Sequence, residues 1–235
     1  MTPTEQSRAA CPAFASTPRQ AMLATTVAMV AGYVDAFGYL SYQTYVSFMS
    51  GNTTQGGYGL GQGAAAVALP ALLAIAAFLT GVFAGTLLAH SRRLAARRLR
   101  FTLAAVILAI IILATRSGLS TSGPFIAALA FGMGILNTCL GQMGAEAVSL
   151  TFVTGTLNRV GTHAALAAMR VPLPDAQGPG DTHARRALLL AGVWVGFFGG
   201  AVLSGLATPR LGVWVLLAPL ATLLALALAE RSGER

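Results

Sequence analysis

Residues 47–57 read Ser-Phe-Met-Ser-Gly-Asn-Thr-Thr-Gln-Gly-Gly, and residues 151–161 read Thr-Phe-Val-Thr-Gly-Thr-Leu-Asn-Arg-Val-Gly. The phenylalanine, the first glycine and the final glycine coincide, and hydroxyl residues match at two further positions. An internal repeat of this kind reflects the architecture of the whole chain. The two stretches indicate that the chain is built from two related halves.

Sequence on either side of these stretches repeats in the same order. Upstream, residues 32–35 (Gly-Tyr-Val-Asp) align with residues 134–137 (Gly-Ile-Leu-Asn) after a two-residue shift. Downstream, residues 81–85 (Gly-Val-Phe-Ala-Gly) align with residues 196–200 (Gly-Phe-Phe-Gly-Gly). We therefore predict one repeat over residues 21–116 and a second over residues 124–229.

The composition is that of a membrane protein. Of the 235 residues, 55% are apolar and only 9% are charged, whereas soluble domains carry about 25% charged residues. This excludes a water-soluble globule and a disordered chain. About 20 helical residues cross the hydrocarbon core of a bilayer. We predict an all-α protein with six transmembrane spans between an N-terminal tail (1–20) and a C-terminal tail (230–235). The spans are 21–43, 66–90, 100–116, 124–146, 187–207 and 211–229.

The basic residues predict an orientation in the membrane. All fifteen are arginines, and thirteen lie in the two tails and in the loops after spans two and four. Only Arg116 and Arg210 fall on the other side. Basic loops stay in the cytoplasm, so we expect a multi-pass protein of the bacterial inner membrane with both termini cytoplasmic. The arginines flank apolar segments and do not alternate with aromatic residues on one face, so nucleic-acid binding is not expected.

Each predicted half has three spans, and an odd number makes the second half enter the membrane from the opposite side. This arrangement is an inverted-topology repeat, with predicted helix breaks after spans one and four. Folds with such repeats are mostly transporters or channels, and their sites lie near the bilayer midplane at the repeat interface.

The two breaks supply candidate binding residues. A hydroxyl, a glycine and further small polar groups follow an apolar span in each half. Glycine permits a tight turn, and serine or threonine caps the start of a helix. The N-terminus of a helix can bind an anion or a polar ligand. An ordinary capped turn at the membrane surface is the alternative. The candidates are Ser50, Gly51, Asn52 and Thr53 in the first half, and Thr154, Gly155 and Thr156 in the second.

Asp35 is an acidic residue inside the first span, and Asn137 is its counterpart in the repeat. A carboxylate at the bilayer centre costs about 2.5–3.5 kcal/mol on insertion scales. We therefore expect Asp35 to face the bundle interior, where it would suit proton coupling or cation binding. A structural hydrogen bond to a neighbouring helix is the alternative.

Three more residues complete the candidate site. Tyr39 lies four residues after Asp35 and could donate a hydrogen bond to it. Gln43 lies beside the tyrosines of this segment, and Glu146 lies near the cytoplasmic end of span four. An interfacial aromatic belt would explain Tyr42 and Tyr45, and an interfacial position would explain Glu146.

Small residues at four-residue spacing predict close helix packing, within the chain or in a homo-oligomer. They are Gly81, Gly85, Gly192, Gly196 and Gly200. The cysteine and histidine spacings suggest no metal site, and no catalytic motif or cofactor-binding loop is visible. We therefore expect neither an enzyme nor a cofactor.

The motifs at residues 32–39 and 47–54, with residues 132–137 and 151–157 in the second half, resemble the YoaK-like family of bacterial integral membrane proteins. The resemblance covers about residues 20–229. It implies a six-helix membrane fold, and it supplies no substrate because the family has no assigned function.

The leading hypothesis from the sequence is a secondary transporter of a small solute, with its site between the two halves. A passive channel is one alternative, and a non-transporting scaffold or sensor is the other.

Overall fold

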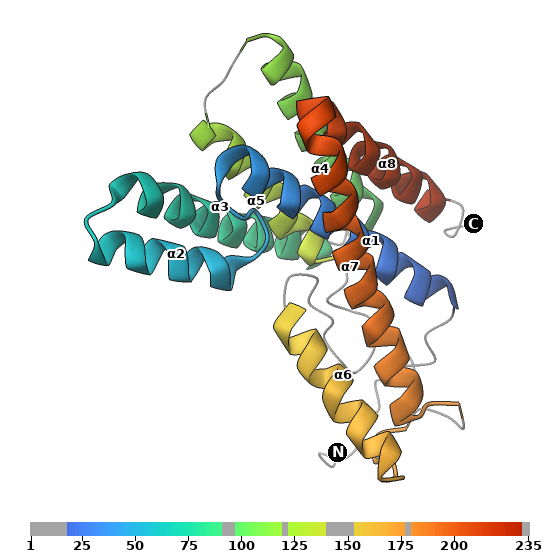
Figure 1. Ribbon diagram of the computed structural model, residues 1–235. Helices are drawn as coiled ribbons and strands as arrows, with labels where there is room; N and C mark the ends of the chain where they lie inside the picture. The colour runs from blue at the N-terminus through green and yellow to red at the C-terminus, as the bar shows by residue number, and fades with distance from the viewer. Residues whose placement is uncertain (1–17, 91–96, 119–121, 140–152, 177–179, 232–235) are drawn as a thin grey trace, which may run out of the picture.

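The computed structural model describes residues 18–90, 97–118, 122–139, 153–176 and 180–231. All the regular secondary structure in these ranges is helical, as the sequence predicts (Figure 1). The elements are α1 (Pro18–Tyr42), α2 (Met49–Gly61), α3 (Ala65–His90), α4 (Arg97–Arg116), α5 (Ser122–Asn137), α6 (Val153–Ala168), α7 (His183–Leu211), the 3₁₀ helix η2 (Gly212–Leu216) and α8 (Leu217–Arg231).

Four stretches of the described chain are long and apolar enough to cross a membrane. They are α1, α3, α4 and the continuous run from α7 to α8. Leu79, Phe83 and Leu87 of α3 illustrate their outer surface, because each is at least 58% exposed. Such side chains are suited to contact with lipid and not with water. The chain is therefore a helical membrane protein.

Five of the six predicted spans correspond to helices of the structure. The run from α7 to α8 turns at the predicted junction, because α7 ends at Leu211 and Gly212 takes a positive φ of 54°. The two helices do not form the predicted hairpin, since α7 packs mainly along α1 and α8 along α4. The predicted span 124–146 corresponds only in part: α5 ends at Asn137, and residues 140–152 lie outside the described ranges. With 16 residues, α5 is shorter than the length that spans a bilayer. Six spans therefore remain a prediction.

Two short helices were not assigned as separate elements from the sequence. The first, α2, has 13 residues and lies against the first half of α3, where Gly56 packs against Leu72 and Gly59 against Ala68. The second, α6, lies against the first part of α7. The two hairpins, α2–α3 and α6–α7, project from the centre in different directions (Figure 1). Neither short helix reaches about 30 Å at 1.5 Å per residue.

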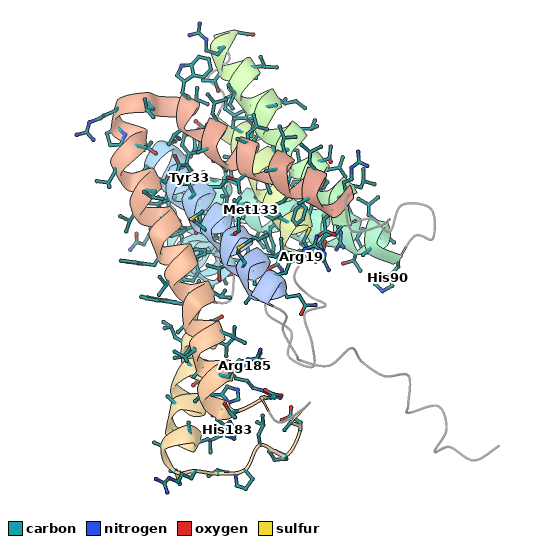
Figure 2. The ribbon with its side chains drawn as sticks, turned by 90° about the vertical axis from the view of Figure 1, so that its right-hand side faces the viewer. Arg19, Tyr33, His90, Met133, His183 and Arg185 are labelled. Carbon is teal, nitrogen blue, oxygen red and sulfur yellow. The ribbon has the colours of Figure 1, made fainter. Side chains whose placement is uncertain are left out.

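The long helices pair across the two halves of the sequence. α1 packs along α7, and the two run side by side in Figure 2. A Cβ atom on Gly32 of α1 would clash with the backbone of Phe197. In the reverse direction, a Cβ atom on Gly200 of α7 would clash with the backbone carbonyl of Met29. Glycine is therefore required on both sides of this contact.

The same reciprocal contact joins α3 to α5. Gly134 of α5 lies directly against the backbone of Phe78, and Gly81 of α3 lies directly against the carbonyl of Phe131. Each half thus supplies one helix to a pair completed by the other half. Gly81 and Gly200 occupy corresponding positions in the two helix pairs, because each lies against a backbone carbonyl of its partner helix. The sequence alignment pairs Gly81 with Gly196 instead, which is one helical turn away.

The five glycines predicted to mediate packing all lie against the protein's own chain. Gly85 faces Thr138, just after the end of α5, Gly192 and Gly196 face Thr25 of α1, and Gly81 and Gly200 make the contacts described above. Their small faces are therefore occupied within one molecule.

Candidate functional site

Asp35 is the centre of the candidate site, and its side chain is 5% exposed. Its Oδ1 atom accepts hydrogen bonds from the backbone N–H groups of Val46, at 2.9 Å, and Ser47, at 2.7 Å. Both donors belong to the segment between α1 and α2. The sequence therefore placed Asp35 correctly in the protein interior. Two donors offset part of the cost of burying the carboxylate.

Asn52 holds the same segment from the other side. It is fully buried in α2, and its side chain makes two hydrogen bonds to the backbone of Tyr45. The Oδ1 atom accepts from the Tyr45 N–H at 3.2 Å, and the Nδ2 group donates to the Tyr45 carbonyl at 2.6 Å. The loop after α1 is thus fastened between an aspartate of α1 and an asparagine of α2.

The serine or threonine cap predicted for the helix after the first break is not found at the start of α2. The N-cap of α2 is Phe48, whose side chain makes no capping hydrogen bond. Asp35 instead binds the two N–H groups just before this position, from another helix. The N–H groups of Val46 and Ser47 are therefore occupied by a carboxylate of the protein itself.

The small polar residues of the first break point in other directions. The hydroxyl of Thr53 donates to the Met49 carbonyl of its own helix, and Thr53 and Ser50 are exposed. Gly51 is half-buried, and a Cβ atom there would contact the ring of Phe48. Among the candidates of this break, only Asn52 is buried with Asp35.

Tyr39 does not donate to Asp35. Its ring stacks on Tyr45 with centroids 4.6 Å apart, and the residue is 39% exposed. Gln43 adopts a positive φ of 53° where α1 ends, and its Nε2 group donates to the Tyr39 carbonyl. Gln55 of α2 donates to the Gln43 carbonyl at 2.9 Å. These residues shape the turn that follows α1.

The second half is described less completely. Asn137 is half-buried at the end of α5, and Thr156 is buried in α6. Thr154 is exposed and Gly155 is half-buried, both in the first turns of α6. Glu146 lies outside the described residues. A shared cavity between the two predicted breaks stays a prediction.

The centre of the described bundle is apolar. A cavity of about 10 Å³ lies between α1, α4, α5 and α8, with Val34, Leu108, Met133 and Leu223 in its wall. This volume is about that of one water molecule. In this conformation, the described helices leave no room there for a solute.

Sequence reasoning missed a buried ion cluster at the start of α7. The Nη2 atom of Arg186 lies 2.7 Å from Oδ2 of Asp181, and its Nη1 atom lies 3.0 Å from Oδ2 of Asp175. Arg186 and Asp181 are both at least 93% buried. Asp175 and Asp181 precede Arg186 by eleven and five residues, and this close succession of opposite charges could have revealed the cluster.

Arg100 is a second buried arginine, at the start of α4. Its Nη1 group donates to the carbonyl of Thr138, at 2.5 Å, just beyond the last residue of α5. A cation at the C-terminus of a helix is favourable because the free carbonyls carry partial negative charge. Arg100 therefore holds the end of α5 in place. The sequence predicted only that this arginine lies on the cytoplasmic side.

A comparison with known proteins gives two matches. A family model described as "Protein of unknown function (DUF1275)" matches residues 23–229. A UPF0700 transmembrane protein of Rhizobium meliloti (strain 1021) is 31% identical over 216 residues, which cover 91% of this chain and 87% of the relative. No solved structure matches the chain.

Proposed function

Since the chain belongs to the DUF1275 family of membrane proteins, whose function is unknown, we propose that it is a secondary transporter of a small solute. In this proposal the chain has six spans arranged as two inverted repeats, and transport is coupled to protons or cations through Asp35.

The observation that carries this proposal is an exchanged pairing of the long helices, in which each helix pairs with one from the other half of the sequence. α1 pairs with α7, and α5 pairs with α3, through matching glycine contacts. Such an exchange is expected when two halves are related by a two-fold axis. Rocking of one pair against the other would open the centre alternately to each side.

Asp35 supplies a mechanism for coupling. As a carboxylate it holds the segment before α2 through Val46 and Ser47. A proton or a cation bound to Asp35 would weaken these hydrogen bonds and release the segment. Binding at one acid would in this way favour a different position of α2.

The apolar centre requires a change of conformation during transport. A cavity of about 10 Å³ admits no solute, so the described arrangement would be a closed state between the two open ones. This feature also favours the second candidate function, a membrane sensor or scaffold that moves no solute.

Proteoliposomes that contain the dye pyranine test the proposal. The purified protein is reconstituted, and amino acids, sugars, organic acids and inorganic ions are added singly outside. We expect at least one of them to change the internal pH, and Asp35→Asn, shown by thermal melting to remain folded, to abolish this response. An unchanged response in that variant would remove Asp35 from the mechanism. Rapid flux independent of ion gradients would indicate a channel, and no flux of any solute would favour the sensor.

Topology mapping tests the inverted repeat separately. Single cysteines are placed at Ala64, Gly118 and Ala176 after Cys11 and Cys139 have been replaced by alanine. A membrane-impermeant maleimide added to intact cells should label the first two positions and not the third. Labelling of Ala176 together with Gly118 would contradict the predicted orientation.

A further inference from the structure

Arginines from two helices meet at the last turn of α8. The Nη2 group of Arg19, in the first turn of α1 (Figure 2), donates to the backbone carbonyl of Ala229 at 3.5 Å. The Nη1 atom of Arg97, the first residue of α4, lies 3.4 Å from Oε1 of Glu230. The side chains of Arg97 and Glu230 are 31% and 27% exposed, and Arg19 is exposed. Both arginines therefore lie at the surface of the same end of the molecule.

The first turn of α4 adds two more positive charges, Arg98 and Arg100, and it contains no acidic residue. The N-terminus of a helix itself carries partial positive charge, so cations are unfavourable there and an anion is favourable. Arg100 is only 6% exposed, and its Nε atom has no hydrogen-bond partner in the described part of the chain. The charges of this turn are thus held together without a compensating anion on α4.

The arginine cluster, defined here as Arg19, Arg97, Arg98 and Arg100, contacts a single carboxylate among the described residues. That carboxylate, Glu230, pairs with Arg97, whereas Arg19 and Arg100 donate to neutral carbonyl groups. The half-buried side chain of Arg98 makes no hydrogen bond or ion pair within the described ranges. Four positive charges against one negative charge leave a surplus of three at this end of the described helices.

Arg98 stands at the end of an apolar face of α4. Val106, Ile110 and Leu113 follow it at steps of four and three residues, and they are 46%, 57% and 66% exposed. Residues at this spacing share one face of a helix. These side chains are suited to contact with acyl chains, which places Arg98 where the lipid headgroups begin. A ligand that satisfies both the charge and the apolar face is amphiphilic.

We propose that the arginine cluster binds the phosphate of an anionic phospholipid, whose acyl chains lie along the exposed face of α4. Clusters of arginines next to membrane helices attract anionic headgroups. Arg98 supplies charge-assisted hydrogen bonds to the phosphate, and Glu230 limits the affinity because it occupies Arg97. A zwitterionic lipid brings a cation of its own and gains less. The inference does not depend on transport, and it holds equally for a sensor.

Native mass spectrometry of the full-length protein, freed of lipid in detergent, tests this site. The protein is titrated with dioleoylphosphatidylglycerol, and with dioleoylphosphatidylcholine as the lipid control with the same acyl chains. We expect the anionic lipid to bind more tightly than the zwitterionic one. Arg98→Gln should weaken binding of the anionic lipid about fivefold, which is the contribution of one arginine near an anionic headgroup.

Two further variants separate this site from a general effect of charge. Arg210→Gln removes an arginine near the turn between α7 and α8, where its Nη1 group donates to a carbonyl of its own helix. This change should leave the affinity for the anionic lipid unchanged. Glu230→Gln frees Arg97 and should strengthen binding. Thermal melting verifies that each variant is folded.

Three results would overturn the proposal. The first is equal affinity for the two lipids, and the second is a loss in Arg98→Gln that is no larger than the loss in Arg210→Gln. The third is displacement of the bound anionic lipid by an excess of inorganic phosphate, which would show a site for a free anion and not for a lipid.

Discussion

The Oδ1 atom of Asp35 in α1 lies 2.7 Å from the backbone nitrogen of Ser47, and this hydrogen bond ties the interior of one helix to the segment before the next. Val46 donates to the same oxygen atom. The acid therefore has a structural role in the described conformation, whatever its role in coupling. A test of its function must separate loss of charge from loss of the fold.

Asp35→Asn and Asp35→Ala should differ strongly in stability. Asparagine keeps an oxygen acceptor for Val46 and Ser47, so we expect a loss of at most about 1.5 kcal/mol. Alanine leaves two buried N–H groups without an acceptor, at about 1–3 kcal/mol each. Thermal or chemical unfolding in detergent measures both changes. Equal stability of the two variants would show that these hydrogen bonds contribute little.

Gly200→Ala should destabilise the protein because the new Cβ atom would overlap the carbonyl of Met29. Overpacking of this kind costs about 1–3 kcal/mol. The neighbouring Gly199 is the matched control, because a Cβ atom there meets nothing within 4 Å. Gly199→Ala should leave the melting temperature unchanged or raise it, since alanine is the better helix former. A tolerated Gly200→Ala would contradict the tight contact of α1 with α7.

Asn52→Ala should weaken the turn after α1. Two hydrogen bonds to the backbone of Tyr45 are lost in a buried place, and we expect a cost of about 2–4 kcal/mol in the free energy of unfolding. The control is Thr53→Ala, whose hydroxyl only bonds a carbonyl of its own exposed helix. That change should stay within about 0.5 kcal/mol. Similar losses of stability in both variants would show that the Asn52 hydrogen bonds contribute no more than the Thr53 hydrogen bond does.

Arg186→Met should be among the more damaging single changes. It leaves Asp181 buried without the arginine that neutralises it, which costs about 3–5 kcal/mol. Arg186→Met combined with Asp181→Leu should recover much of this loss, because no buried charge then remains. The half-buried Arg185 is the control, and Arg185→Met should have a small effect. Urea unfolding followed by circular dichroism compares the four proteins, and a double variant no better than Arg186→Met would refute this explanation.

Much of the fold could be predicted from the sequence because long apolar runs bounded by arginines directly reflect the thickness of a bilayer. α1, α3, α4, α7 and α8 were recognised in this way. α2 was missed because its glycines and small polar residues resemble a loop, and only its packing against α3 makes it a helix. The sequence alignment paired Gly81 with Gly196, whereas the contacts make Gly200 its counterpart. Gly196 and Gly200 lie one turn apart on α7, so the sequence alone could not distinguish the two alignments.

The candidate site was predicted in part. The cost of a charge in the membrane placed Asp35 inside, but it could not reveal which donors the carboxylate binds. Tyr39 has the right spacing for Asp35, and yet stacking on Tyr45 directs it elsewhere. The hydrogen bond between His163 of α6 and His183 of α7 joins residues twenty positions apart through the packing of two helices, and no local sequence pattern predicts it.

The exchanged helix pairs also constrain how the protein is made. α1 enters the membrane early in synthesis, but its glycine-matched partner α7 emerges from the ribosome only after the entire first half has been translated. During that interval the buried face of α1 must be covered by lipid or by the insertion machinery. The first half can therefore reach its final packing only when the second half arrives, and a ribosome stalled before α7 would leave a membrane-inserted but incomplete product.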